Sequence, residues 1–269
     1  RIDRMLSLKG LTPKYLASTD NFYKYEYVNG DTYSTVVQNG NFKRFLHWAD
    51  QNLWKKTDVD ISDISEDFYY NKTYKRVVKY LTDNGMGTDG PCFINGTRVE
   101  SVFDLLAGID KEVLRSKQSY QFHGDCVLEN IIFWGRGPDQ EEYTLIDWRQ
   151  DFGGDKYHGD IYYDLAKLKH NLIVDHAILD KGLYTINIDS SDITLDILRS
   201  HEKDECIGHL HEFVKYKFLS RRKLDIIVGL IWLSMAPLHP QPLGDFLFYI
   251  GKYHLYGALM KPDGWGCNP

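Results

Sequence analysis

The sequence predicts an α+β fold in which a mainly helical body carries a small β-sheet at its front. Apolar residues recur at helical spacing over residues 32–54 and in three segments after residue 199. Two short stretches, 14–28 and 131–147, are typical of hairpins. The chain has 269 residues, 43% of them hydrophobic, which is enough for a large core, and it shows no repeat or low-complexity linker.

The first half of the chain is predicted to form a hairpin and then helices. The segments KYLAS and FYKYEYV are rich in aromatic residues and flank a turn at Thr19-Asp20-Asn21. Phe42, Phe45 and Ala49 follow helical spacing. In chain order we expect strands at 14–18 and 22–28, helices at 32–54 and 67–84, a loop at 86–97 and a short helix at 99–108.

The second half is predicted to be mostly helical after one further hairpin. The apolar run 226–238 is shorter than the roughly 20 residues of a membrane span and is predicted to be a buried helix. We expect strands at 131–134 and 143–147 joined by a turn at 135–142, a helix at 161–172, a strand pair within 184–195, and helices at 199–220, 222–236 and 242–260.

Composition and charge exclude several classes of protein. The 32 basic and 38 acidic residues give a net charge of −6, which argues against a general nucleic-acid binder, because such proteins need clustered positive charge. The four cysteines are scattered without paired spacing, and the first residues lack the apolar segment of a signal peptide. We therefore expect a cytoplasmic protein with no membrane span.

One polar cluster interrupts apolar sequence and is the strongest candidate for a site. Asp125 and Asn130 bracket four residues, and Asp147 ends the strand that pairs with the segment after Asn130. A carboxylate and an amide oxygen suit Mg²⁺, which binds phosphate, and Asp125 would be free to accept a proton from an attacking hydroxyl. This division of roles matches phosphoryl transfer. Taken singly, each residue could instead cap a turn or begin a strand.

These segments resemble a known superfamily. HGDCVLEN at 123–130, LIDW at 145–148 and GDIYYDLAKL at 159–168 are similar to the aminoglycoside phosphotransferase and choline kinase superfamily, the small-molecule branch of the protein-kinase-like fold. The resemblance implies a catalytic base at Asp125, Mg²⁺ ligands at Asn130 and Asp147, and ATP as phosphoryl donor. The last two of these segments also resemble kinase-like domains that are encoded with bacterial surface-polysaccharide genes.

Three further residues are expected to support the catalytic loop. His123 precedes Asp125 in the His-Gly-Asp segment. Asp164 begins the DLA turn of a helix, where its carboxylate would accept hydrogen bonds from backbone N–H groups of the loop. Asp160 is predicted to be the N-cap of the same helix. For Asp160 and Asp164 a structural role is favoured over contact with substrate.

The sequence YEYVNGDT at 25–32 fits the hinge of this superfamily, where free backbone groups meet the adenine edge. The hinge residues would be Glu26, Tyr27 and Val28, although an ordinary strand end is an alternative. Residues 1–28 are then a remnant of the N-terminal lobe with the hinge strand, and residues 29–269 a helical C-terminal lobe. No glycine-rich loop and no strand lysine precede the hinge.

Few residues precede the predicted hinge, and three explanations for this remain open. We favour a piece of a longer protein with a fused or associated upstream domain. The other two are a minimal kinase and a kinase-derived binding module. The predicted function is transfer of the γ-phosphoryl of ATP to a hydroxyl of a small molecule, most simply a sugar or sugar-like metabolite. The alternatives are a non-catalytic module that binds nucleotide or a partner, and, among enzymes, a choline or ethanolamine kinase whose aromatic residues enclose an ammonium group.

Overall fold

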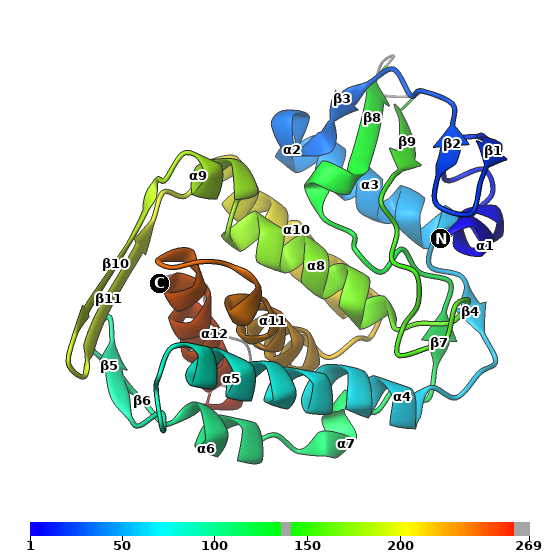
Figure 1. The fold of residues 1–269 in the computed structure, drawn as a ribbon. Coiled ribbons are helices and arrows are strands. Elements are labelled where there is room, and N and C mark those ends of the chain that lie inside the picture. The colour runs from blue at the N-terminus through cyan, green and yellow to red at the C-terminus, as the bar shows by residue number, and fades with distance from the viewer. Residues whose placement is uncertain (136–140, 261–269) are drawn as a thin grey trace.

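The computed structural model describes residues 1–135 and 141–260, and the α+β class predicted from the sequence is confirmed there (Figure 1). The helices and helical turns in these ranges are α1 (Ile2–Ser7), α2 (Tyr33–Val36), α3 (Asn39–Asn52), α4 (Ser62–Glu66), η1 (Asp67–Asn71), α5 (Lys72–Asp83), α6 (Val102–Ala107), α7 (Lys111–Leu114), η2 (Leu128–Asn130), α8 (Ile161–Ile173), α9 (His176–Asp180), α10 (His201–Tyr216), α11 (Arg221–Met235), η3 (Ala236–Leu238) and α12 (Leu243–Met260).

The strands are short and form four small sheets. They are β1 (Tyr15–Ser18) with β2 (Tyr23–Tyr25), β4 (Lys56–Thr57) with β7 (Ser119–Tyr120), the sheet of β3 (Asp31–Thr32), β8 (Ile131–Gly135) and β9 (Glu141–Leu145), and the sheet of β10 (Tyr184–Asp189), β11 (Asp192–Ile197), β5 (Cys92–Ile94) and β6 (Thr97–Val99).

Helix α11 lies at the centre of the helical body and packs against α5, α8 and α12 (Figure 1). Its residues from Leu224 to Ser234 are all buried, because this apolar segment has helices on several sides. Lys169 of α8 forms a buried ion pair with Asp225 of α11. No helix in the described ranges is long and apolar enough to cross a membrane.

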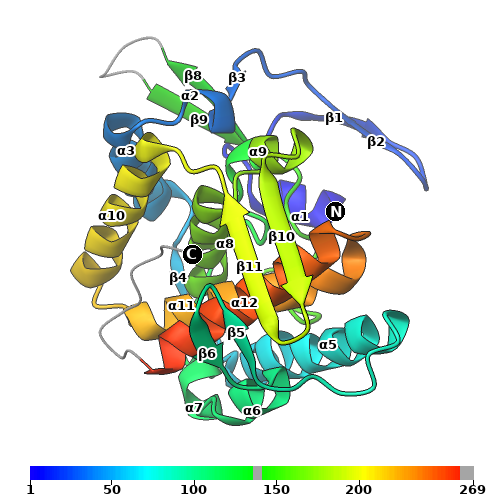
Figure 2. The same ribbon diagram turned by 90° about the vertical axis from the view of Figure 1, so that its left-hand side faces the viewer.

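The sheet of β3, β8 and β9 holds the hairpin that leads into the predicted site. Ile131 pairs with Leu145, and Asp31 pairs with Phe133 at the outer edge. The aromatic rings of Tyr33 and Tyr143 pack against each other with centroids 5.6 Å apart, which fixes the hairpin on α2. The second large sheet covers α12 on another side, where Tyr184 contacts Phe246 (Figure 2).

Most predicted elements of the second half are confirmed, including the helices at α8, α10, α11 and α12 and both hairpins. Residues 136–140 of the predicted turn at 135–142 lie outside the described ranges.

The single helix predicted over 32–54 is wrong. Val37 and Gln38 are extended, and the chain begins a new helix at Asn39. The side chain of Asn41 accepts a hydrogen bond from Gln38 N at 2.9 Å and donates one to Val36 O at 2.8 Å. A polar side chain that binds the backbone in this way favours a helix start over a helix interior.

Two other boundaries also differ from the prediction. The helix expected at 67–84 begins earlier, at Ser62, and contains a π-helical turn at Asp67–Asn71 before α5. The loop expected at 86–97 holds β5 and part of β6, joined at Asn95 and Gly96, which both have positive φ. An Asn-Gly turn of this type is a strong hairpin signal that the sequence contained.

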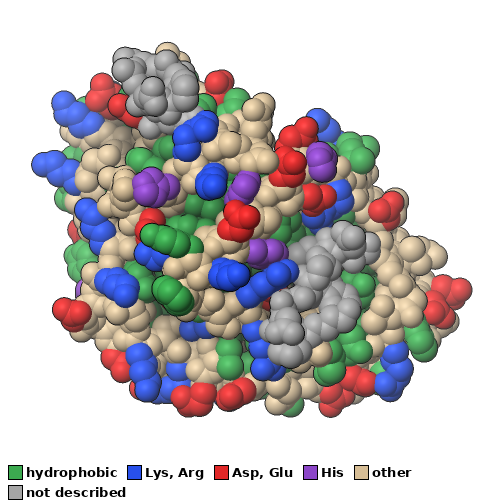
Figure 3. Space-filling model, turned by 180° about the vertical axis from the view of Figure 1, so that it is seen from behind, with side chains coloured by type: hydrophobic (Ala, Val, Ile, Leu, Met, Phe, Trp, Pro, Cys, Tyr) green, Lys and Arg blue, Asp and Glu red, His purple; other side chains and the backbone are tan. Residues whose placement is uncertain are grey.

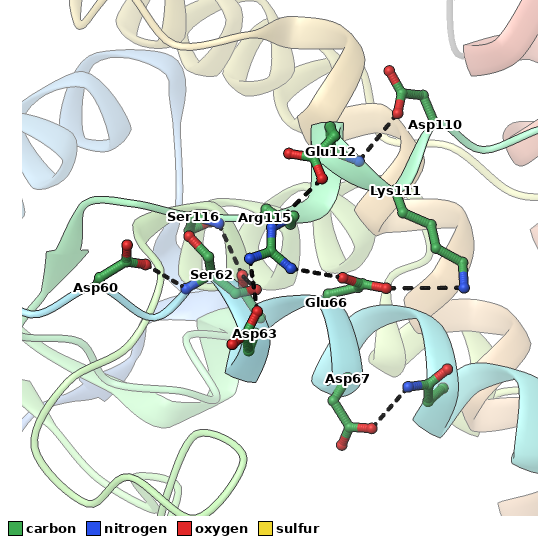
Figure 4. A network of polar contacts seen from close by, with 12 residues as sticks. Asp60, Ser62, Asp63, Glu66, Asp67, Asp110, Lys111, Glu112, Arg115 and Ser116 are labelled. Carbon is green, nitrogen blue, oxygen red and sulfur yellow. Dashed lines mark hydrogen bonds and ion pairs between the residues drawn. The ribbon is translucent and has the colours of Figure 1, made fainter.

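A network of ion pairs connects α4 with α7 and with Arg115, the residue that follows α7. Arg115 reaches Asp63 at 2.6 Å and Glu66 at 3.0 Å, and Lys111 approaches Glu66 at 3.8 Å (Figure 4). On the face turned away in Figure 1, Lys and Arg side chains are interspersed with Asp and Glu side chains (Figure 3).

Candidate active site

One face of α8 holds the loop 121–130 in place. Asp164, Lys167 and Asn171 follow one another at spacings of three and four residues, which puts them on the same side of a helix. Each contacts a different part of the loop: Asp164 the backbone of His123 and Gly124, Lys167 the side chain of Asp125, and Asn171 the backbone N–H of Leu128 at 2.8 Å. The helix therefore fixes the whole loop.

Asp164 is fully buried and accepts three hydrogen bonds. His123 N and Gly124 N donate to its two oxygens at 2.7 and 2.6 Å, and Trp54 Nε1 donates at 3.0 Å. Burial raises the pKa of Asp164, against the effect of His123 and of these donors. Its role as an acceptor for loop N–H groups is the one expected from the sequence.

Gly124 allows the loop to turn at this point. Its φ is +85°, and a Cβ there would lie 2.5 Å from Arg149 Cβ and 2.7 Å from the Phe122 ring. Only glycine combines this backbone conformation with such close contacts. The His-Gly-Asp segment thus has a steric reason for its central residue.

His123 is buried and connects the loop to the segment after β9. Its Nε2 lies 2.9 Å from Ile146 O, and Asp125 N lies 3.2 Å from its Nδ1. A carbonyl only accepts and a backbone N–H only donates, so Nε2 carries the proton and the ring is neutral. Burial lowers the pKa of His123, in keeping with a neutral ring.

Asp125 is the partly exposed carboxylate at the tip of this arrangement. Its Oδ1 forms an ion pair with Lys167 Nζ at 2.8 Å. Burial opposes ionisation of Asp125, but the charge and hydrogen bond of Lys167 outweigh it, so its pKa is lowered. The group is therefore an ionised carboxylate that can accept a proton.

Asn130 and Asp147 lie on either side of the hairpin base. Asn130 Nδ2 donates to Asp125 O at 2.9 Å, which leaves the amide oxygen as its remaining polar atom. Ile146 N donates to Asn130 O at 2.9 Å, which brings the backbone beside Asp147 close to Asn130. The prediction that Asp147 ends strand β9 is wrong. Asp147 lies two residues beyond the strand and has a φ of 51°. Asp tolerates this left-handed conformation better than most residues.

Asp125 and Asp147 line one cleft of about 260 Å³ with Arg1, Trp148 and Arg149. The Asp147 side chain is 54% exposed and pairs with Arg1 at 2.5 Å. Asn130 does not line this cleft itself. The amide oxygen and the carboxylate are both hard donors that suit Mg²⁺. No group of three or more His, Cys, Asp or Glu side chains suited to a metal occurs in residues 1–135 and 141–260, so a cation here would also depend on phosphate and water oxygens.

The predicted hinge residues Glu26, Tyr27 and Val28 line a separate cleft of about 680 Å³, with Trp134 and Thr144 on the hairpin side. This volume is within the range of small-molecule and cofactor sites. Glu26 N donates to Lys14 O at 2.8 Å, so that N–H is engaged. Tyr27 and Val28 make no backbone–backbone hydrogen bond with another described residue, which leaves their polar groups for a ligand.

Asp160 caps α8 by accepting a hydrogen bond from Tyr162 N at 3.1 Å, as predicted. Its other contacts lead away from the loop 121–130, to Tyr69, Ser116 and Lys223. It supports the loop only through the position of α8.

Sequence reasoning missed a buried arginine in α1. Arg4 Nη2 donates to Phe122 O at 2.6 Å and its guanidinium lies over the Phe122 ring. Met5 and Leu8 share the main core, so residues at the start of the chain pack directly against the loop. Nothing local in the sequence distinguishes Arg4 from a surface arginine. The domain boundary placed after residue 28 stays a prediction.

Comparisons with protein-family models, with curated proteins and with solved structures found no match to this chain.

Proposed function

We propose that this protein is a phosphotransferase that moves the γ-phosphoryl group of ATP to a hydroxyl of a small molecule, and that its fold is of the protein-kinase-like type. The observation that carries the proposal is the loop 121–130, which α8 holds. In this loop Asn130 Nδ2 donates to the backbone carbonyl of Asp125, and the ionised Asp125 carboxylate shares a cleft with Asp147. Phosphoryl transfer requires a base, oxygen ligands for a cation and an open cleft, and these residues would supply them.

In this proposal each residue has a defined task. Asp125 orients the acceptor hydroxyl and takes its proton, since its carboxylate is ionised and borders the cleft. Tyr27 and Val28 offer backbone groups to the adenine edge. Asn130 and Asp147 would hold Mg²⁺, which when bound neutralises charge on the phosphates. Asp164 and His123 position the loop without touching substrate.

The hairpin offers a path between the two clefts. Side chains alternate along a strand, so Trp134 and Ile132 lie on one face of the hairpin with Thr144. These residues are only partly buried, unlike Ile131 and Leu145 on the other face. A nucleotide lying along this face would extend from the hinge cleft toward Asp147.

A non-catalytic module is the second candidate, and a specific observation favours it. Two of the three acidic groups of the cleft are paired with cations, Asp125 with Lys167 and Asp147 with Arg1. The pair with Arg1 is largely exposed, and such pairs contribute only about 0–1 kcal/mol, so a cation or phosphate can displace it. The pair with Lys167 is more buried and is the stronger argument for the module.

Replacing Asp147 by Asn is expected to abolish Mg²⁺-dependent ATP binding and to leave the circular-dichroism spectrum and melting temperature near wild type. Asn keeps the size of the side chain and tolerates its φ of 51°, and the carboxylate that is lost makes only an exposed ion pair. Titration calorimetry with Mg·ATP and with ATP in EDTA measures this.

Asp151→Asn is the matched control, because Asp151 lines the same cleft and an Asn there can still accept the hydrogen bond from Gly154 N. This variant should bind Mg·ATP like the wild type. An Asp147→Asn protein with unchanged Mg·ATP affinity would refute the ligand assignment.

A further inference from the structure

A third hollow, separate from the two clefts described above, begins at Asp125 on the side of the helices. It has a volume of about 190 Å³ and is bounded by η1, α5, α8, α11 and η3. Its size limits the occupant to a small molecule or to one end of a larger one. Asp125 lines both this cavity and the cleft that contains Asp147. A hydroxyl in the cavity could therefore reach the same carboxylate that borders the Asp147 cleft.

The charged lining of this cavity is strongly unbalanced. Four cations, Lys72, Arg76, Arg149 and Lys167, face one carboxylate, Asp125, which Lys167 already pairs. In residues 1–135 and 141–260 no ion pair joins Lys72, Arg76 or Arg149 to a carboxylate. Among the described residues, three basic side chains of the cavity thus have no ion-pair partner.

Lys72 is exceptional among the lysines that extend into the interior. The buried lysines have carboxylate partners: Lys169 with Asp225, Lys203 with Asp175, Lys223 with Asp160 and Lys252 with Asp89. Lys72 directly follows the π-helical turn η1 in the chain. Its Nζ lies 3.4 Å from the centroid of the Phe68 ring. Arg149 lies over the same ring at 5.0 Å. Two cations on one aromatic ring, neither of them in an ion pair with a described carboxylate, make a site suited to an anion.

We propose that the acceptor is a small hydroxyl compound bearing a negatively charged group, carboxylate or phosphate, which Lys72, Arg76 and Arg149 bind while its hydroxyl faces Asp125. This inference rests on the proposed function, which it narrows to one substrate class. A choline- or ethanolamine-type acceptor would bring a further positive charge into a cavity already lined by four basic side chains, two of them arginines. The same charge would repel it.

The protonation state of Lys72 offers a second way to detect a bound anion. Burial, together with the charges of Arg149, Arg76 and Lys167, lowers the pKa of Lys72 to about 6, opposed only by the carboxylate of Asp151. A bound anion favours the charged lysine, so binding should take up a proton above pH 6. Affinity for a carboxylate ligand, whose own charge is constant over this range, should fall as the pH rises from 6 to 8.

The test is titration calorimetry of the wild-type protein with four probes: glucose, glucuronate, glucose 6-phosphate and choline. We expect binding of glucuronate, of glucose 6-phosphate or of both, which identifies the anionic group, and no comparable binding of glucose or choline. Lys72→Met should weaken anion binding by about 10- to 100-fold, the effect of one lost charge-assisted hydrogen bond. It should also remove the pH dependence and keep Mg·ADP affinity.

Lys75→Met is the control, since Lys75 is an exposed lysine of the same helix that does not line the cavity. Equal affinity for charged and neutral sugars, or a Lys72→Met protein that loses Mg·ADP but not the anionic sugar, would overturn the inference. Transfer of phosphate to neutral sugars alone would overturn it while the proposed function stands. Binding of the anionic sugar through Lys72 without any transfer would leave the anion site intact and count against the proposed function.

Discussion

Replacing Asp125 by Asn is expected to lower phosphoryl transfer by roughly 10²–10⁴-fold, the usual contribution of a positioned base. The fold should persist, because the Asp125 side chain is 37% exposed and Asn has nearly the same shape. Mg·ATP affinity should persist too, since the base acts on the acceptor hydroxyl rather than on the nucleotide. Single-turnover rates and Mg·ATP calorimetry on the same preparation measure both quantities.

Lys167→Met separates the base from its ion pair. This variant removes the partner of Asp125 but keeps the carboxylate, so it should lose less activity than Asp125→Asn. Without Lys167 the effect of burial dominates and the pKa of Asp125 rises, so the acid limb of kcat/KM should move to higher pH. Equal losses in the two variants would assign the effect to the ion pair, and wild-type turnover by Asp125→Asn would exclude the base.

Replacing Asp164 by Ala is expected to cause the largest loss of stability of any single change at this site. It leaves the backbone N–H groups of His123 and Gly124 and the indole N–H of Trp54 without their acceptor. Each buried unpaired donor costs about 1–3 kcal/mol, which gives a total of at least ~3 kcal/mol. At about 2–4 °C per kcal/mol the melting temperature should fall by roughly 6–12 °C.

Two further variants show whether the carboxylate itself is needed. Asp164→Asn should be nearly as damaging as Ala, because the two backbone donors use both oxygens and an amide has only one. Trp54→Phe removes the indole N–H together with its hydrogen bond to Asp164, so no donor is left unpaired and the loss of stability should be far smaller. Differential scanning calorimetry measures the melting temperatures and so ranks the three variants by stability. A stable but inactive Asp164→Ala protein would place Asp164 in contact with substrate.

The residues that sequence reasoning located are those whose roles depend on local spacing. Asp125, Asn130 and His123 lie within eight residues, and the cap at Asp160 and the acceptor at Asp164 follow from the start of one helix. Lys167 and Asn171 continue the same helical face, so the spacing from Asp164 contained a usable signal for them.

Other features depend on contacts between distant segments. Lys72 and Arg149 come together because both lie over the rings of Phe68 in η1 and Tyr163 in α8. The parallel pairing of β11 with β5 joins residues about 100 positions apart, for which the sequence has no periodic signal. The break at Gln38 arises from one asparagine side chain that competes with the helix backbone.

The most direct test is phosphorus NMR of the protein, expressed from its complete reading frame, with Mg·ATP and a panel of neutral, anionic and cationic hydroxyl compounds. The proposal predicts that the γ-phosphate signal of ATP is replaced by ADP and a phosphomonoester of one acceptor, and that this reaction is lost in Asp125→Asn. Binding of Mg·ATP without transfer to any acceptor would contradict it and would assign the protein to the non-catalytic class.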